Sequence, residues 1–327
     1  MNDRPKIAIY WLGACGGCDS SLIDLGESLL ELAEAVEIVI WPVALDFKHD
    51  RLAALPDKSL ALAIISGCVR NSAHREMAEL LRAKSCVVLA CGACACLGGI
   101  PGLANLRPKG EIMAWVYGEA PTVVNPERIR PERNCEMNGE QLELPEFYDH
   151  VYALNQVVAV DYYLPGCPPP LDLLLGAIQG LLGNQPPPPG SILASAKSLC
   201  DSCSRNRTKP ARMELKTVSR PHETVVEPEA CFLAHGVICL GPVTRDGCGG
   251  SCLSVNAPCR GCFGPVAGVC DSGARFLASL ASLLAPGDEA EFRALVEAIA
   301  DPAGYACRFT QPVSILGARK LEAEDKQ

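Results

Sequence analysis

Five short apolar runs, rich in β-branched residues, recur along the first half of the chain and constrain its fold more than any other feature. They cover residues 6–12, 36–45, 60–66, 86–91 and 157–164. Segments with helical periodicity lie between or after them, at 19–35, 72–83 and 171–183. Strands that alternate with helices form parallel sheets, and continuous apolar runs are typical of strands covered on both faces. Residues 1–183 are therefore predicted to form a flavodoxin-like, doubly wound α/β domain with right-handed crossovers.

The rest of the chain has a different character. Residues 100–150 contain several prolines and little periodicity, and we interpret them as an insertion. The proline-rich segment 184–190 is predicted to be a stiff linker between two domains. Residues 191–327 then form a smaller, irregular domain that ends in helices, which we expect to pack on this same domain. Nine cysteines fall between residues 198 and 270, so bound metal is expected to supply much of its core.

Charge and composition argue against nucleic-acid binding and a membrane span, and they indicate metal binding. The net charge is −9 and no run of Lys or Arg stands out, which argues against a nucleic-acid partner. No apolar stretch approaches the roughly 20 residues that span a bilayer, and the N-terminus shows no leader, so a cytoplasmic location is predicted. The chain has 19 cysteines. In a reducing compartment such a number indicates metal binding rather than disulfides.

Many of these cysteines directly follow the predicted strands of the first domain. They are Cys15 and Cys18 after the first strand, Cys68 after the third, Cys91, Cys94 and Cys96 after the fourth, and Cys167 after the fifth. Loops at the carboxyl ends of parallel strands converge, so these thiols should gather at one edge of the sheet. Four thiolates suit an iron–sulfur cluster or tetrahedral zinc, and a single C-x-x-C also suits a redox pair. Glycines on either side, whose amides can approach the sulfurs, favour the cluster.

Five motifs in combination resemble the small subunit of a NiFe hydrogenase: "GACGGCDSSLIDL", "GACACLGGIPG", "DYYLPGCPPP", "CLGPVTRDGCGGSC" and "APCRGCFGP". The cytoplasmic methyl-viologen-reducing type is most similar, and the sulfhydrogenase small subunit comes second. The resemblance runs from about residue 6 to 280. It implies an electron-transfer subunit with three 4Fe–4S clusters, which connect the Ni–Fe centre of a separate large subunit to a cytoplasmic acceptor.

The resemblance assigns twelve cysteines to three sets and no catalytic residue to this chain. The proximal set is Cys15, Cys18, Cys94 and Cys167; the medial set is Cys248, Cys252, Cys259 and Cys262; the distal set is Cys200, Cys203, Cys231 and Cys239. A further iron–sulfur or flavin subunit is expected to accept electrons at the distal set. Spacing alone permits other partitions of the eight cysteines in the second domain.

Several positions differ from the residues that some members of this family have there, and one position allows two interpretations. Oxygen-tolerant relatives have an extra cysteine at Gly17, so an ordinary proximal cluster is implied here. Cys252 supplies a fourth medial cysteine and implies 4Fe–4S instead of 3Fe–4S. The family usually has an acidic residue at Ser66. Asp19 is interpreted either as a proton-coupling or large-subunit contact, or as the N-cap of its helix.

Two other functions are also compatible with parts of the sequence. One is a complex-I-like electron-transfer subunit, which would share the first domain but typically lacks the cysteine-rich second one. The other is a non-enzymatic zinc protein or redox sensor. The cysteines outside the three sets are predicted to be mostly small buried hydrophobes: Cys68, Cys86, Cys91, Cys96, Cys135, Cys270 and Cys307. Of these, Cys68 and Cys91 lie in loops that face the proximal set.

Overall fold

The first domain contains the predicted parallel sheet. The computed structural model describes residues 4–46, 48–183, 185–299 and 301–316. Five parallel strands have the order β2-β1-β3-β5-β9. Their bounds are β1 (Lys6–Trp11), β2 (Glu37–Ile40), β3 (Leu60–Ser66), β5 (Ser85–Cys91) and β9 (Tyr162–Leu164). This is the flavodoxin-like order, so the predicted fold class is confirmed.

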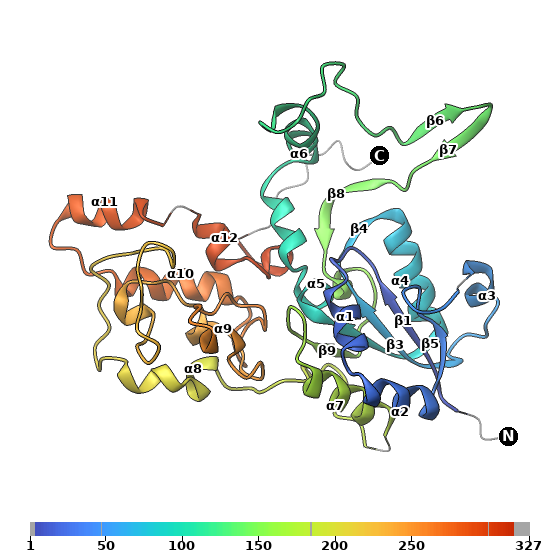
Figure 1. Cartoon of the computed structure of the whole chain (residues 1–327), viewed down its shortest axis with the longest axis horizontal. Helices are drawn as coiled ribbons and strands as arrows, with labels where there is room; N and C mark the ends of the chain where they lie inside the picture. The colour runs from blue at the N-terminus through green and yellow to red at the C-terminus, as the bar shows by residue number, and fades with distance from the viewer. Residues whose placement is uncertain (1–3, 47, 184, 300, 317–327) are drawn as a thin grey trace.

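Helices cover both faces of this sheet (Figure 1). One face packs against α1 (Gly17–Ile23), α2 (Glu27–Ala35) and α7 (Leu171–Leu182); the other packs against α3 (His49–Ala53), α4 (Ser72–Lys84) and α5 (Gly92–Leu97). Alternation along β1 produces this division, because Ile7 and Ile9 point to the first layer and Ala8 to the second. The strands are thus buried on both sides, as their continuous apolar runs predict.

Several boundaries differ from the sequence prediction. The helix expected over 19–35 is two helices, because the chain turns at Gly26, whose φ is +58°. The strand expected over 36–45 ends at Ile40, where a turn begins: the carbonyl of Trp41 accepts hydrogen bonds from the amides of Ala44 and Leu45. The strand expected over 157–164 keeps only its last three residues.

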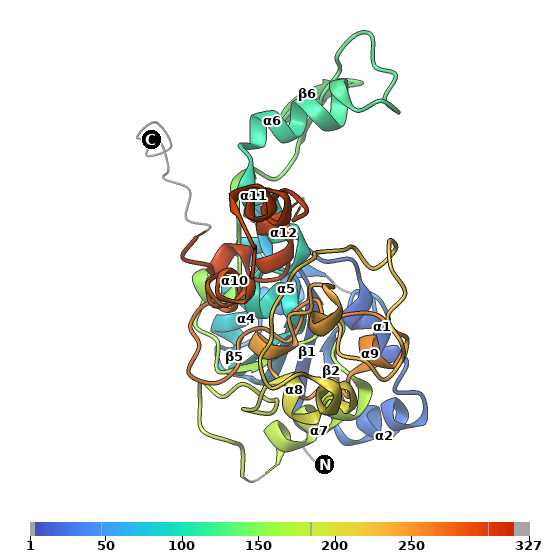
Figure 2. The same ribbon diagram turned by 90° about the vertical axis from the view of Figure 1, so that its left-hand side faces the viewer.

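The insertion is more ordered than its sequence suggests. It contains η1 (Ile100–Leu106), α6 (Lys109–Ala114), η2 (Trp115–Glu119), β6 (Asn134–Met137), β7 (Glu140–Glu143) and β8 (Phe147–Tyr152), and η3 (Leu154–Gln156) follows. Strand β8 pairs antiparallel with β4 (Val69–Asn71), and β6 pairs with β7 in a hairpin. The segment from α6 to β7 projects away from the rest of the molecule (Figures 1 and 2).

The second domain consists of short helices and loops around its own apolar cluster. Its elements are α8 (Leu199–Ser202), η4 (Ser204–Thr208), η5 (Leu233–His235), η6 (Gly241–Val243), α9 (Ser251–Ser254), α10 (Ser272–Leu283), α11 (Glu289–Glu297), α12 (Pro302–Ala306) and η7 (Gln311–Val313). Phe232, Phe276 and Leu280 pack there together with Cys239 and Cys259. Cysteines are therefore part of this core.

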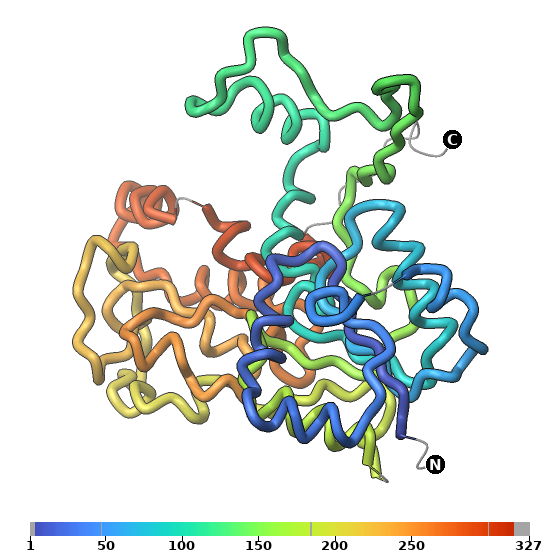
Figure 3. Tube along the Cα trace, turned by 45° about the vertical axis from the view of Figure 1, so that its right-hand side comes forward, coloured from blue at the N-terminus to red at the C-terminus, as the bar shows by residue number. Residues whose placement is uncertain are grey.

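The two domains lie side by side (Figure 3). Two segments attach the second domain to the first. After the proline-rich segment, the chain runs along β9: the amide of Tyr163 donates to Ser191 O (3.1 Å), and the amide of Leu193 donates to Tyr163 O (2.7 Å). Near the end of the chain, the amide of Gly99 donates to Phe309 O (3.1 Å). The segment beyond α12 thus returns to the first domain, whereas α10, one of the helices expected to pack on the second domain, contributes Phe276 and Leu280 to its core. The boundary at 184–190 itself stays a prediction.

None of the helices in the described part of the chain is long and apolar enough to cross a bilayer.

Candidate metal centres

The proximal set lies where three strands of the sheet end. Cys15 and Cys18 follow β1, Cys94 is in α5 directly after β5, and Cys167 follows β9. Burial raises the pKa of the Cys94 thiol to about 12, and nearby sulfurs, including the other three of the set, add to the shift. Cys15 and Cys167 are exposed. The structure therefore brings the four predicted residues together at a site that opens on the surface.

Two glycines leave room for these sulfurs. Gly92 has a φ of +84° and Gly99 a φ of +62°, a region that favours glycine. A Cβ at Gly92 would collide with Sγ of Cys18, and a Cβ at Gly99 would collide with Sγ of Cys94. Any larger residue at either position would displace a proximal sulfur. The motif "GACACLGG" thus shapes the space around the thiols as well as supplying one of them.

Two cysteines outside the set also lie here. The thiols of Cys18 and Cys91 lie beside each other, and this contact together with burial raises the pKa of Cys18. Cys68 donates from its Sγ to Gly13 O at 3.0 Å, and burial raises the pKa of its thiol to about 11. Both are buried, as expected for small hydrophobes, but both also contact the proximal loops. The sequence signal was their position, with Cys68 just after β3 and Cys91 at the end of β5.

Asp19 has a different role from helix capping. The N-cap of α1 is Gly16, and no side chain caps it. The buried Asp19 carboxylate accepts hydrogen bonds from Trp41 Nε1 (3.1 Å) and Ser66 Oγ (3.2 Å). Burial raises its pKa, and these two hydrogen bonds oppose the shift. A carboxylate therefore lies beside Ser66, although residue 66 itself is not acidic, and the capping interpretation of Asp19 is wrong.

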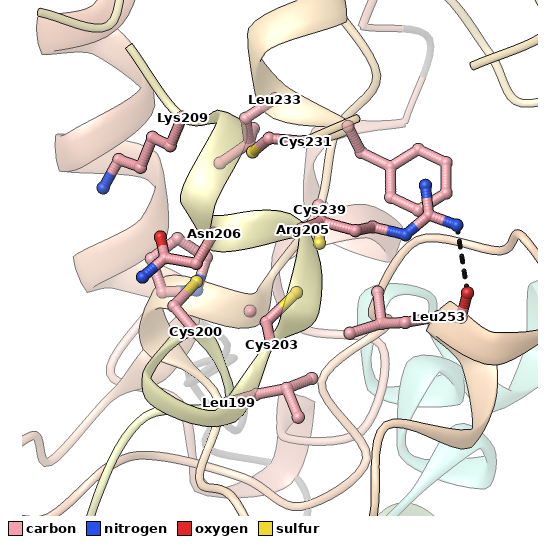
Figure 4. Close-up of a pocket in the computed structure, with 13 residues that line it drawn as sticks. Leu199, Cys200, Cys203, Arg205, Asn206, Lys209, Cys231, Leu233, Cys239 and Leu253 are labelled. Carbon is pink, nitrogen blue, oxygen red and sulfur yellow. Dashed lines mark hydrogen bonds between the residues drawn. The ribbon is translucent and has the colours of Figure 1, made fainter. Parts of the chain in front are cut away.

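The distal set surrounds one pocket, which Figure 4 shows in close-up. All four of its cysteines line this pocket together with apolar side chains, among them Leu199, Leu233 and Leu253. Burial raises the pKa of the Cys200 thiol to about 12, and the neighbouring Cys239 adds to the shift. A Cβ at Gly241 would lie 3.2 Å from Sγ of Cys200, so glycine keeps this side of the pocket open.

A buried arginine holds the segments around this pocket. Arg205 lines the pocket and is 3% exposed (Figure 4). Its Nη1 donates to the carbonyls of Glu227 and Ala230 (both 3.1 Å), and its Nη2 donates to Leu253 O (3.0 Å) and Asn256 Oδ1 (2.8 Å). Its guanidinium also lies 4.4 Å from the ring centroid of Phe232. One side chain thus joins the segments that carry Cys203, Cys231 and Cys252, a role for which the sequence contains no signal.

The medial set lies between the other two. Burial raises the pKa of the Cys262 thiol to about 12, and Cys248 and Cys252 add to the shift. Burial also raises the pKa of the Cys259 thiol, and the neighbouring sulfurs of Cys239 and Cys262 add to this shift. The amide of Cys259 donates to Sγ of the distal Cys239 at 3.3 Å. On the other side, the backbone of the proximal Cys167 lies beside the Cys262 thiol. The three sets therefore adjoin in the order proximal, medial, distal.

The donor chemistry of all three sets fits iron–sulfur ligation. Each offers four thiols, and two of the sets are bounded by glycines that make room for the sulfurs. The buried thiols have raised pKa values, so they need the positive charge of bound iron to become thiolates. In residues 4–316, apart from those at 47, 184 and 300, no three His, Cys, Asp or Glu side chains meet closely enough to bind one metal ion.

Comparison with known proteins identifies the family. Residues 15–181 match the model of the NADH ubiquinone oxidoreductase 20 kDa subunit. The chain is 39% identical, over 86% of its length and 88% of the relative's, to the iron–sulfur subunit of the F420-non-reducing hydrogenase of Archaeoglobus profundus. It is 32% identical, over 100% of both chains, to the corresponding subunit of the F420-non-reducing hydrogenase of Methanothermobacter marburgensis. The chain belongs to the small-subunit family of NiFe hydrogenases.

Membership of this family confirms the predicted function as an electron-transfer subunit of a hydrogenase, which is an oxidoreductase. It implies iron–sulfur clusters in this small subunit and a large subunit as its partner. The family model shared with the 20 kDa subunit ends at residue 181, whereas the hydrogenase relatives align along the cysteine-rich second domain as well. The hydrogenase interpretation is thus supported over the complex-I-like alternative. A NiFeSe hydrogenase of Dm. baculatum shares the fold, with a TM-score of 0.51 and 17% identity over 80% of this chain and 95% of that one.

Proposed function

We propose that this small subunit relays electrons, through three 4Fe–4S clusters, between the Ni–Fe site of a large subunit and a cytoplasmic acceptor. When bound, such clusters would supply one-electron redox sites. The proximal set would hold one cluster, the medial set the second and the distal set the third. The cytoplasmic location of the chain remains a prediction from its sequence.

The order in which the three cysteine sets adjoin is the observation that carries this proposal. The backbone of Cys167 meets the thiol of Cys262, and the amide of Cys259 meets the sulfur of Cys239. Twelve thiols thus form a continuous series from the edge of the sheet to the pocket of the second domain. Structural zinc sites or isolated redox pairs would not require such a series.

The exposed end of the series indicates where the large subunit docks. Cys15 and Cys167 are exposed, whereas thiolates that hold a redox cluster next to a catalytic site need exclusion of water. We place the large subunit over this edge, which we call the proximal edge. A further acceptor subunit, an iron–sulfur or flavin protein, would dock near the distal pocket.

Two residues specify the kind of cluster that we propose. Gly17 has no thiol, so the proximal set has no extra cysteine beside Cys18 and suits an ordinary 4Fe–4S cluster. Cys252, at the start of α9, supplies the fourth medial ligand. A 4Fe–4S medial cluster suits a low-potential acceptor.

The test is metal and sulfide analysis of the complex purified anaerobically from its native host. We expect about twelve iron atoms with matching sulfide per small subunit, and nickel in a co-purifying large subunit. Zinc without sulfide would overturn the proposal. Iron and sulfide without nickel would favour the complex-I-like alternative.

A further inference from the structure

Residues 107–146 form a projection that we call the arm. It consists of α6, η2, an extended segment and the β6–β7 hairpin, and all views show it standing out from the body (Figures 1, 2 and 3). Every residue of β6 and β7 is exposed, and neither α6 nor η2 has a buried residue. A two-stranded hairpin is at best marginally stable alone in water. The contacts within the hairpin are therefore not enough to stabilise its folded conformation.

The hairpin has a largely apolar face whose side chains are exposed in the described part of the chain. In its register Cys135 is opposite Leu142, so these two residues share a face with Met137 and Leu144 and with Glu140, which lies opposite Met137 at the turn end. Asn134, Glu136, Gln141 and Glu143 lie on the other face. Met137 is 59% exposed, Leu142 45% and Leu144 51%. An alternating pattern of this kind is typical of a sheet with one buried face, and here that face is bare.

The helical part of the arm also has exposed apolar side chains. Trp115 is 54% exposed and Val116 49% exposed. Aromatic side chains at this exposure are frequent anchors of protein–protein interfaces. The arm thus offers exposed apolar groups on both of its parts.

The root of the arm is held rigidly. The buried side chain of Asn105 bonds both backbone groups of Val151, donating to its O (2.9 Å) and accepting from its N (2.8 Å). The amide of Lys109 donates to Asp149 Oδ1 at 2.6 Å, and Lys109 Nζ donates to Phe147 O at 2.9 Å. Both chain segments that enter the arm, η1 and β8, are therefore fixed to each other. A rigid root presents the arm at a set angle, as a preformed docking element requires.

Continuity with the proximal edge identifies the partner. Helix η1, which leads into the arm, begins at Ile100, next to the Gly99 that lies against Cys94. Exposed apolar residues mark this path: Ile100 is 48% and Leu106 42% exposed, and Trp11 and Ile23 are exposed on the proximal elements themselves. Helix α8, with Cys200 of the distal set, lies at the other end of the molecule from the hairpin in Figures 1 and 2.

We infer that the arm docks on the hydrogenase large subunit and extends the interface that begins at the proximal edge. This inference rests on the proposed function, because it takes the large subunit to lie over Cys15 and Cys167. It adds a second contact region, built from the apolar face of the β6–β7 hairpin and from Trp115.

Photo-cross-linking in the assembled complex tests the inference. A benzophenone side chain replaces Met137 in one preparation and Val225, a residue of the second domain that is 89% exposed, in the control. We expect position 137 to cross-link to the large subunit, and position 225 not to do so. Cross-links from 137 to a second small subunit, to the acceptor subunit or to nothing would each overturn the inference.

Substitution supplies an independent readout. The double variant Met137→Ser/Leu142→Ser should weaken association of the two subunits by about tenfold, whereas Val225→Ser should leave it unchanged. Equal association of both variants with the large subunit would contradict the inference. Failure of the proposed function looks different: the wild-type chain itself would then purify without a nickel-bearing subunit.

Discussion

At the scale of single residues, glycines decide whether the sulfurs fit. Gly92 and Gly99 have positive φ angles. Because neither has a side chain, each leaves room for a proximal sulfur atom. The Asp19 carboxylate accepts hydrogen bonds from Trp41 and Ser66 and thereby holds α1, the helix that contains Cys18, in place. Small changes at these positions should therefore act on cluster binding before they act on the fold.

Gly92→Ala should abolish proximal cluster binding, because its Cβ would displace Sγ of Cys18. The change should remove about four iron atoms per chain, measured by iron analysis and by loss of one EPR signal. Gly139→Ala is a matched control: its φ of +81° imposes a similar strain, of about 1–2 kcal/mol, but no atom lies within 4 Å of the added Cβ. Equal iron content in both variants would contradict this role for Gly92.

At the scale of elements, a buried arginine joins several segments of the second domain. Arg205 joins η4, the segment around residues 227–232 and α9, and its four hydrogen bonds all reach acceptors of other segments. These segments carry ligands of both the distal and the medial set. The relative position of two cysteine sets is thus coupled to one guanidinium.

Arg205→Met should lower the free energy of unfolding by about 3 kcal/mol, because it leaves buried carbonyl groups without donors. The expected observations are a lower anaerobic unfolding midpoint of the complex and weaker distal and medial EPR signals. Arg207→Met provides the comparison, since Arg207 is exposed and paired with Glu229 at the surface. An Arg205→Met complex that unfolds at the wild-type temperature would contradict this stabilising role of Arg205.

At the scale of the whole molecule, the two domains make one path. The proximal set belongs to the first domain, and the medial and distal sets belong to the second. Pairing of residues 191–193 with β9 and the return of the tail at Phe309 hold the domains together. Contact between Cys167 and Cys262 depends on this attachment.

Cys252→Ser should convert the medial cluster to 3Fe–4S and interrupt this path. We expect a new EPR signal in the oxidised protein and acceptor reduction by H₂ slowed roughly tenfold, with hydrogen isotope exchange at the partner's Ni–Fe site unchanged. Cys270→Ser, at an exposed cysteine outside the three sets, should match the wild type. An unaltered EPR spectrum in Cys252→Ser would reassign the fourth medial ligand.

The sequence by itself determined the sheet, its order and the family. Apolar runs of β-branched residues that alternate with helical segments predict parallel strands covered on both faces, and the loops at the carboxyl ends of such strands converge, which brings Cys15, Cys94 and Cys167 together. The resemblance of five motifs to a known family then indicated the hydrogenase small subunit. These features are local or follow from chain connectivity, so periodicity and spacing predict them.

Only the tertiary structure decided which distant residues meet. The contact between Cys259 and Cys239 and the hydrogen bonds of Arg205 depend on packing between irregular segments, for which the sequence has no periodicity. The same holds for Asp19, whose partners lie far along the chain, and for the hairpin in the insertion, whose apolar face follows from strand register. Function here begins with local motifs, but the order of the path comes from long-range packing.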